Sequence, residues 1–233
     1  MKILAFDTST NSCTVAVGDE RVLVQKRSSG SKKHAEQLMP LIEEALGEAN
    51  LSPSQLDAIA FGEGPGPYTS LRIAAATAQA MSLSHSINVY PIDSMEALAV
   101  KSRRLSAPAQ IDGNVLVATD ARRGEIYFAA FKFDSSGGLK KTNKTILTTP
   151  SKIEIEQNTT WARIGDGWEV YEKSFKKEVL SVPLLQSHSP EASDLIDIVF
   201  AQITTDSGKD ASMALPVYFR EAVHIAEQPN DSA

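Results

Sequence analysis

The chain has 233 residues, of which 42% are hydrophobic and 22% charged, and this composition excludes intrinsic disorder as the main state. Its 23 Lys and Arg against 29 Asp and Glu leave a formal net charge of −6, which argues against strong nucleic-acid binding by the chain alone. The single cysteine, Cys13, excludes a disulfide framework within the chain. Because no apolar run has the length of a membrane span, we expect a cytoplasmic protein.

The first half of the chain alternates short apolar runs with polar turns. Strands are predicted at residues 2–6, 13–17, 21–27, 57–61 and 89–92. Helical spacing of apolar residues predicts helices at about residues 33–50, 70–83 and 94–104, of which the second is rich in alanine. Pro40 lies inside the first helix, and Ser52-Pro53 has the sequence of a further helix start. The density of glycine and proline predicts that residues 62–69 form no regular element.

The opening pattern of the chain returns after residues 106–113, which are the best candidate for a linker. A strand at 115–119 ends in Asp120, a tight turn follows, and residues 125–133 form the next strand. Strand, aspartate, turn and hairpin therefore occur twice, at Asp7 and at Asp120. The alternative is coincidence, because strands often end in aspartate.

We therefore predict two lobes, residues 1–105 and 106–233, with the final segment free to pack back on the first lobe. A strand at 161–164 and a helix capped by Ser189-Pro190 complete the second half.

A strand that ends in aspartate and turns through small hydroxyl residues suits contact with phosphate. The N–H groups and hydroxyls of such a turn can face an anion, and the carboxylate can hold a hydrated metal ion. Asp7, Thr8 and Ser9 form this turn in the first half, and Asp120 and Arg122 are the candidate match in the second. These five residues are predicted to line a nucleotide cleft between the lobes. Ordinary turn chemistry is the alternative for all of them.

Residues 62–69 open onto a helix N-terminus and are a second candidate anion site. The glycine spacing matches neither a Walker loop nor a dinucleotide fingerprint, and a rigid structural turn is the alternative. No metal site is predicted, because the four histidines are scattered and the residue four after His34 is Leu38. Cys13 lies in an alternating strand with no neighbouring histidine, so no catalytic nucleophile is identified.

Five segments, taken in chain order, resemble the TsaB (YeaZ) family. They are residues 4–10 (LAFDTST), 64–73 (GPGPYTSLRI), 120–127 (DARRGEIY), 165–167 (GDG) and 216–220 (PVYFR). The resemblance covers nearly the whole chain. The chain departs from the family's glycine-rich motif at Pro67, Tyr68, Ser70 and Ala74, where Ser, Phe, Gly and Gly are usual. These changes remove an N–H and stiffen the loop, which weakens the case for anion contact there.

The resemblance implies an α/β, two-lobed actin-like ATPase fold (ASKHA, ribonuclease H-like) with duplicated mixed sheets flanked by helices. It also implies a non-catalytic subunit of the complex that transfers a threonylcarbamoyl group to adenosine 37 of tRNA. The implied partners are the catalytic subunit TsaD and the ATPase TsaE, with a TsaC-type adenylate synthase acting indirectly and tRNA reached through the complex. Alone, two copies would pair. No cofactor is expected in the isolated chain, and ATP or ADP would bind only in the assembled complex.

The resemblance further points to the helices at 33–50 and 70–83 as the partner surface. Small apolar residues surround the second helix almost completely, which predicts burial on more than one face and close approach by another helix. The predicted partner-binding residues are Leu38, Leu41, Ile42, Ala45, Ile73, Ala75, Ala78 and Met81.

Two functions from other classes compete with this one. A small-molecule kinase or ATPase of the same fold would need a catalytic base and a substrate pocket, for which the chain has little room. A glycoprotease-like peptidase would need a nucleophile with a base, or a metal, and neither is identified.

Overall fold

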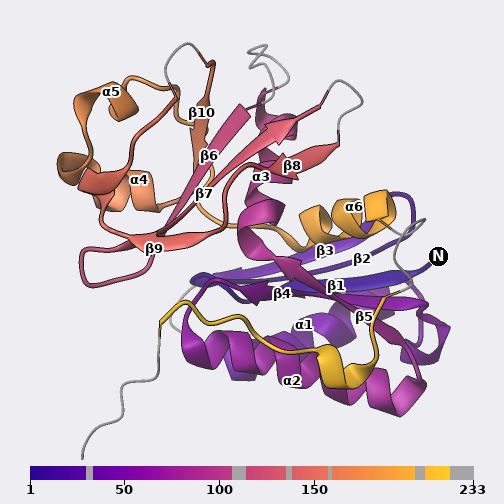
Figure 1. Ribbon diagram of the computed structural model, residues 1–233. Coiled ribbons are helices and arrows are strands. Elements are labelled where there is room, and N and C mark those ends of the chain that lie inside the picture. The colour runs from indigo at the N-terminus through magenta and orange to yellow at the C-terminus, as the bar shows by residue number, and fades with distance from the viewer. Residues whose placement is uncertain (30–33, 107–113, 135–137, 157–158, 203–207, 221–233) are drawn as a thin grey trace, which may run out of the picture.

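A computed structural model describes residues 1–29, 34–106, 114–134, 138–156, 159–202 and 208–220. Two mixed β-sheets lie one above the other, with helices α3 (Ser94–Ser106) and α6 (Ala192–Gln202) between them (Figure 1). Helices α1 (His34–Glu48) and α2 (Tyr68–His85) cover the far face of the first sheet. The predicted linker at 107–113 lies outside the described residues. Within the described part of the chain, no helix has the length and apolar character needed to cross a membrane.

The first sheet has the strand order β3-β2-β1-β4-β5. Its antiparallel strands are β1 (Ile3–Asp7), β2 (Ser12–Gly18) and β3 (Val22–Ser29). Strands β4 (Ala58–Gly64) and β5 (Asn88–Asp93) run parallel to β1. Every residue of β1 and β2 is buried, because helices cover both faces of the sheet.

The second sheet has the order β10-β6-β7-β8, and β9 also pairs with β7. Its strands are β6 (Asn114–Asp120), β7 (Ile126–Phe133), β8 (Leu139–Lys141), β9 (Ile146–Thr148) and β10 (Ala162–Ile164). The short helices α4 (Gly167–Val170) and α5 (Lys177–Leu180) cover one face, where Trp168 is fully buried. Single 3₁₀ turns lie at Pro53–Gln55 (η1), Pro150–Lys152 (η2), Glu172–Ser174 (η3) and Ala211–Met213 (η4).

Both sheets repeat one arrangement of a central strand with an antiparallel hairpin partner on one side and a parallel strand on the other. In the first sheet these strands are β1, β2 and β4, and in the second they are β6, β7 and β10. Asp7 and Asp120 therefore end equivalent strands. The prediction of a fold with duplicated mixed sheets flanked by helices is confirmed.

The irregular segment after the fourth strand is shorter than the sequence predicts. β4 continues through Gly64 and α2 already begins at Tyr68, so the prediction that 62–69 holds no regular element is wrong at both ends. Gly62 and Gly64 pair with Ile92 and Asp93 of β5, and this tertiary pairing overrides the weak strand preference of glycine.

The two prolines near predicted helix starts have different structural roles. Pro40 lies inside α1 without ending it, whereas Ser52-Pro53 starts only the single 3₁₀ turn η1.

Helix α6 follows the second sheet in the chain but packs on the first. Its Leu195, Ile196 and Val199 share a buried cluster with Ile3 and Ala5 of β1. The predicted lobe boundary at residue 105 stays a prediction. Helix α6 comes after this boundary in the chain but packs on the first sheet.

A network of ion pairs joins α3 to α6. Asp194 of α6 is fully buried and pairs with Arg104 of α3, while its second carboxylate oxygen accepts the backbone N–H of Glu191 at 2.8 Å. Lys101 pairs with Glu191 at 2.8 Å, and Arg104 also reaches Asp197 at 3.0 Å. Burial raises the pKa of Asp194 to about 7, and the charges of Arg104 and Lys101 oppose that rise.

We expect Arg104→Leu to lower the free energy of unfolding by about 3–5 kcal/mol at pH 8, because it leaves the Asp194 carboxylate buried without its partner. The loss should be smaller at pH 5. Asp194 has a raised pKa in the folded state, so at pH 5 the folded chain holds it mostly protonated and uncharged. The stability that comes from binding this proton is lost as pH rises through that pKa. Denaturant titrations at both pH values measure this. The double variant Arg104→Leu/Asp194→Asn should recover most of the loss at pH 8, and no recovery would contradict the explanation.

Candidate functional site

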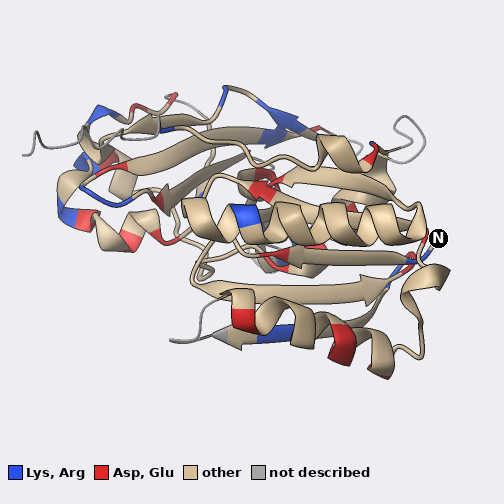
Figure 2. Cartoon of the chain, turned by 90° about the horizontal axis from the view of Figure 1, so that it is seen from below, with Lys and Arg blue, Asp and Glu red and all other residues tan. Residues whose placement is uncertain are grey.

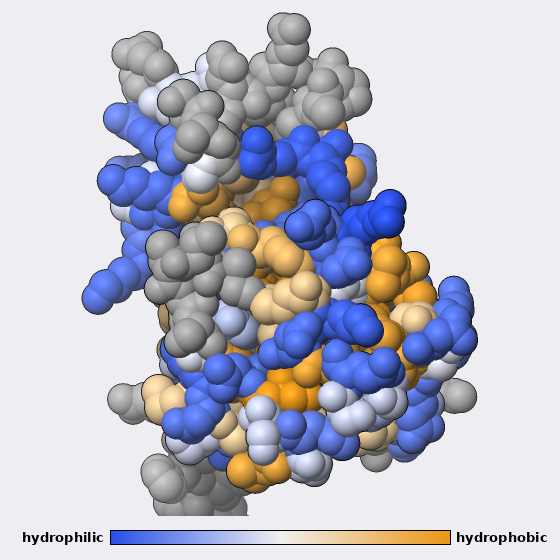
Figure 3. Space-filling model, turned by 90° about the vertical axis from the view of Figure 1, so that its right-hand side faces the viewer, coloured by the Kyte–Doolittle hydropathy of each residue, from blue (hydrophilic) through white to orange (hydrophobic). Residues whose placement is uncertain are grey.

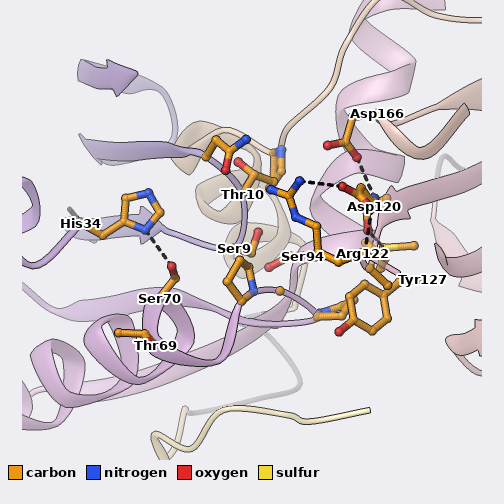
Figure 4. Close-up of a pocket in the computed structure, with 18 of the residues that line it drawn as sticks. Ser9, Thr10, His34, Thr69, Ser70, Ser94, Asp120, Arg122, Tyr127 and Asp166 are labelled. Atoms are coloured by element: carbon orange, nitrogen blue, oxygen red, sulfur yellow. Dashed lines mark hydrogen bonds and ion pairs between the residues drawn. The ribbon is translucent and has the colours of Figure 1, made fainter. Parts of the chain in front are cut away.

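An open pocket of about 650 Å³ lies between the two sheets and is the candidate site; we call it the cleft. Its walls come from the turn after β1, the segment between β4 and α2, and the turn after β6, with the start of α3 also lining it (Figure 4). Of the predicted nucleotide-contacting residues, Ser9, Asp120 and Arg122 line the pocket, whereas Asp7 and Thr8 do not.

Asp7 lies behind the wall of this cleft with 1% of its surface exposed. One carboxylate oxygen accepts the backbone N–H and hydroxyl of Ser9 at 2.8 and 2.7 Å, and the other accepts the hydroxyl of Ser94 at 2.8 Å. Burial raises the pKa of Asp7, and these hydrogen bonds oppose the rise. Asp7 therefore joins β1, the following turn and the first residue of α3.

Glycine is required where the neighbouring strand passes this carboxylate. A Cβ at Gly62 would lie 1.9 Å from Asp7 Oδ2, and a Cβ at Gly66 would lie 2.5 Å from the carbonyl oxygen of Ser9. The glycine-rich motif thus lets β4 and the following segment approach the turn after β1. The structure gives these two glycines a packing role.

Ser70 connects the start of α2 to this wall. Its carbonyl oxygen accepts the hydroxyl of the buried Thr8 at 2.8 Å, and its own hydroxyl lies 2.9 Å from Nδ1 of His34. His34 and Ser70 both line the pocket (Figure 4). This contact depends on Ser70, which stands where the family pattern has glycine.

The opposite wall centres on Asp120. Its Oδ1 accepts the backbone N–H of Arg122 and the hydroxyl of Tyr171, both at 2.7 Å, and its Oδ2 pairs with the Arg122 guanidinium at 3.1 Å. The Asp120 N–H donates to Asp166 at 2.9 Å. Burial raises the pKa of Asp166. Asp166 and Tyr171 were missed as site residues, although Gly165-Asp166-Gly167 marks the turn that brings Asp166 there.

The turn after β6 has an unusual backbone. Arg122, Arg123 and Gly124 all have positive φ, at 64°, 57° and 79°. Left-handed conformations are costly for residues with a Cβ. The hydrogen bonds from Arg122 N–H to Asp120 and from Glu125 N–H to the carbonyl of Arg122 stabilise this turn.

Nucleotide is the ligand that the fold class implies, and the residues lining the cleft do not fit it unaided. The described acidic and basic side chains that line it are Asp120, Asp166 and Arg122, with His34 on the opposite wall. Arg122 is the one Lys or Arg among these described lining residues, and its 70% exposed side chain pairs with Asp120, so a polyphosphate would meet two carboxylates and a single arginine. Asp7, the predicted cation ligand, already accepts three hydrogen bonds.

The described residues form neither a metal site nor a reactive thiol site. No group of three or more His, Cys, Asp and Glu side chains within them could hold a metal ion. Cys13 is buried, and burial raises the pKa of its thiol to about 12.

The predicted partner-binding side chains lie mostly beneath α1 and α2. Six of them are at most 9% exposed and pack on the first sheet: Leu38, Ile42, Ala45, Ala75, Ala78 and Met81. Leu41 and Ile73 are partly buried against the same cluster. These residues build the chain's own core, because the apolar stripe of a helix first serves the sheet that it covers. A partner surface on α1 and α2 would therefore have to use the exposed faces of these helices, and it stays a prediction.

Those exposed faces differ in charge. α2 exposes Arg72, Ala76, Ala80 and Leu83, of which Leu83 is 74% exposed, and the helix has no acidic residue. Figure 2 shows α2 as a helix with little Lys, Arg, Asp or Glu, beside the acidic residues of α1. Small exposed residues such as Ala76 and Ala80 suit close packing by another helix.

A second hollow of about 640 Å³ lies between α3, α6 and β7–β8. Apolar side chains that line it include Val100, Phe133 and Leu139. Figure 3 faces this side of the molecule and shows apolar side chains gathered between hydrophilic ones. None of the predicted site residues lines this hollow.

The duplicated mixed sheets define a two-lobed protein with the actin-like ATPase fold. A family model described as "TsaD: tRNA N6-adenosine threonylcarbamoyltransferase" matches residues 23–200. The protein called tRNA threonylcarbamoyladenosine biosynthesis protein TsaB from Buchnera aphidicola subsp. Schizaphis graminum is 30% identical over 86% of this chain and 93% of its own length. The Haemophilus influenzae protein of the same name is 28% identical over 98% of both chains.

Solved structures agree with these relatives. YeaZ from Pseudomonas aeruginosa superposes with a TM-score of 0.81 at 29% identity, covering 93% of this chain and 99% of its own. A second structure, described as an uncharacterized protein with similarity to peptidase YEAZ from Pseudomonas aeruginosa, has a TM-score of 0.82 at 29% identity, covering 94% of this chain and 99% of its own. The chain belongs to the TsaB (YeaZ) family, within the wider group that the TsaD model describes.

Proposed function

We propose that this chain acts in the synthesis of threonylcarbamoyladenosine in tRNA as a non-catalytic subunit that docks and supports a TsaD-type catalytic subunit. The observation that carries the proposal is similarity over nearly the full length of relatives named TsaB tRNA threonylcarbamoyladenosine biosynthesis proteins. The matching family model is itself described as the transferase TsaD, so the catalytic partner would be a structural relative of this chain.

The chemistry of the cleft supports a non-catalytic role. Catalysis of acyl or phosphoryl transfer requires positioned charge around the reacting group. Here Asp7 is buried under three hydrogen bonds, and Asp120 is held by Arg122 and Tyr171. These contacts favour carboxylates that stabilise the lobes over carboxylates that act on a substrate.

The exposed faces of α1 and α2 are the proposed docking surface for the catalytic subunit. The same faces would pair two copies of this chain when that subunit is absent. The ATPase TsaE would join the assembled complex, a TsaC-type synthase would supply the threonylcarbamoyl adenylate, and tRNA would be reached through the complex. Any ATP or ADP would bind only in that assembly.

The proposal is tested by reconstitution with purified TsaD-type and TsaE-type subunits, the adenylate synthase, ATP, threonine, bicarbonate and unmodified tRNA. We expect modification of adenosine 37 in the full mixture and at least a tenfold loss when this chain is left out. Nucleoside analysis by mass spectrometry measures the product. Full modification without this chain would contradict the proposed role.

The chain alone should hydrolyse ATP no faster than the buffer blank. Its described cleft residues offer the transferring phosphate a single arginine, Arg122, which pairs with Asp120. Phosphate release measured with the wild type and with Asp120→Asn is the check. Turnover that disappears in Asp120→Asn would favour the ATPase alternative instead.

A further inference from the structure

The last described segment, residues 208–220, crosses from the first lobe to the second, and we call it the C-terminal strap. It begins beside β5, passes η4 and runs along α2 toward the start of that helix (Figure 1, yellow). It has almost no regular structure, so what holds it is its contacts with the rest of the chain.

Backbone hydrogen bonds fasten most of the strap to the first lobe. Val89 and Lys209 exchange two of them, at 2.7 and 2.8 Å. The side chain of Gln79 donates to the carbonyl of Ala214 at 2.9 Å, and the N–H of Val217 donates to the carbonyl of Glu63 at 2.8 Å.

Tyr218 then packs on the first turns of α2. Its ring lies 4.7 Å from that of Tyr68, and its hydroxyl accepts Nε of Arg72 at 3.0 Å. The guanidinium of Arg72 also lies 4.1 Å from the centroid of the Tyr68 ring. This cluster ends the part of the strap that belongs to the first lobe.

The next two residues, Phe219 and Arg220, contact the second lobe. The ring of Phe219 lies 5.7 Å from that of Tyr127, and Arg220 pairs with Glu125 and donates to the carbonyl of Ala121 at 3.4 Å. Ala121 and Tyr127 line the cleft. Consecutive residues therefore contact the two sides of the cleft: Tyr218 packs on the first turns of α2, and Phe219 packs on Tyr127 of the opposite wall.

We propose that the C-terminal strap is a latch that sets the width of the cleft. On the other side of the cleft, α3 packs on both sheets, the chain returns to the first sheet through α6, and Lys141 pairs with Asp93. At the edge of the cleft near α2, the strap contacts the second sheet through Phe219 and Arg220. Releasing these two side chains should let the turn after β6 move away from α2, with α3 as the hinge. Because the strap contacts both α2 and the wall at Tyr127, anything that binds α2 near Tyr68 would also act on the cleft.

Spin labels on the two lobes of the full chain test the latch. Labels at Glu43→Cys in α1 and Lys173→Cys in η3 occupy exposed positions, while the native Cys13 is buried. Pulsed electron paramagnetic resonance should give a longer and broader distance distribution in Phe219→Ala/Arg220→Ala than in the wild type. Amide exchange at Ala121 and Glu125 should become roughly tenfold faster. Met213→Ala is the matched control, since this exposed strap residue lies in η4, which packs beside α2 and β5 of the first sheet.

A charge exchange keeps the test decisive if the double alanine variant fails to fold. Arg220→Glu should widen the distribution, and adding Glu125→Arg should restore it. An unchanged distance distribution and unchanged exchange in folded latch variants would overturn the proposal. These measurements use the chain without partners, so they decide the latch whatever the outcome of the reconstitution.

Discussion

A bulky charge on the exposed face of α2 should abolish assembly with the catalytic partner. We expect Ala76→Arg to weaken binding about a thousandfold, which corresponds to about 4 kcal/mol. Ala76 is exposed on a helix without acidic residues, so α2 itself would supply no counter-charge to a guanidinium enclosed by a docked partner. Burying an unpaired charge at a packed interface costs several kcal/mol. Titration calorimetry with the purified partner measures the affinity.

Two further variants make the result specific. Ala80→Arg, one turn along the same face, should behave as Ala76→Arg does. Ala201→Arg places the same exposed substitution in the last turn of α6, away from α2, and should leave affinity and modification unchanged. All three should keep the wild-type circular dichroism spectrum, because none of these alanines is buried. Folded α2 variants that bind the partner with wild-type affinity would remove α2 from the interface.

A single methyl group beside Asp7 should be the most damaging small change in the first lobe. We expect Gly62→Ala to lower the free energy of unfolding by about 3–5 kcal/mol. The new Cβ would lie 1.9 Å from Asp7 Oδ2 and 2.9 Å from the Ser94 hydroxyl. The carboxylate cannot move aside without losing its bonds to Ser9 and Ser94. Denaturant unfolding followed by tryptophan fluorescence and circular dichroism measures the change.

Gly47→Ala is the matched control for that substitution. No atom beyond the helix's own neighbouring backbone lies within 4 Å of a Cβ placed at Gly47, in the last turn of α1. Replacing an exposed helical glycine with alanine should raise stability by about 0.5–1 kcal/mol. If Gly62→Ala proves as stable as Gly47→Ala, the packing role assigned to Gly62 is wrong.

The repeated pattern, and the order of elements in the first half of the chain, follow from the sequence alone. Apolar runs that end in Asp7 and Asp120, each before a hairpin, predict two related sheets because burial from both sides favours continuous apolar strands. The same reading fails where pairing between strands decides the outcome. Gly62 to Gly64 extend β4 because β5 lies alongside, a neighbour that local propensity does not reveal.

The tertiary structure alone decides what the site residues do. Asp7 and Asp120 carry the same local signature, yet burial places Asp7 behind the wall while Asp120 lines the cleft. Periodicity shows that Ala75 and Ala76 lie on α2 but not which of them faces the sheet, because an alanine-rich helix has no distinct apolar stripe. Likewise, PVYFR marks residues 216–220 in the sequence, but only folding brings Phe219 to Tyr127 and Arg220 to Glu125. Such contacts join residues almost a hundred positions apart, and local sequence carries no record of them.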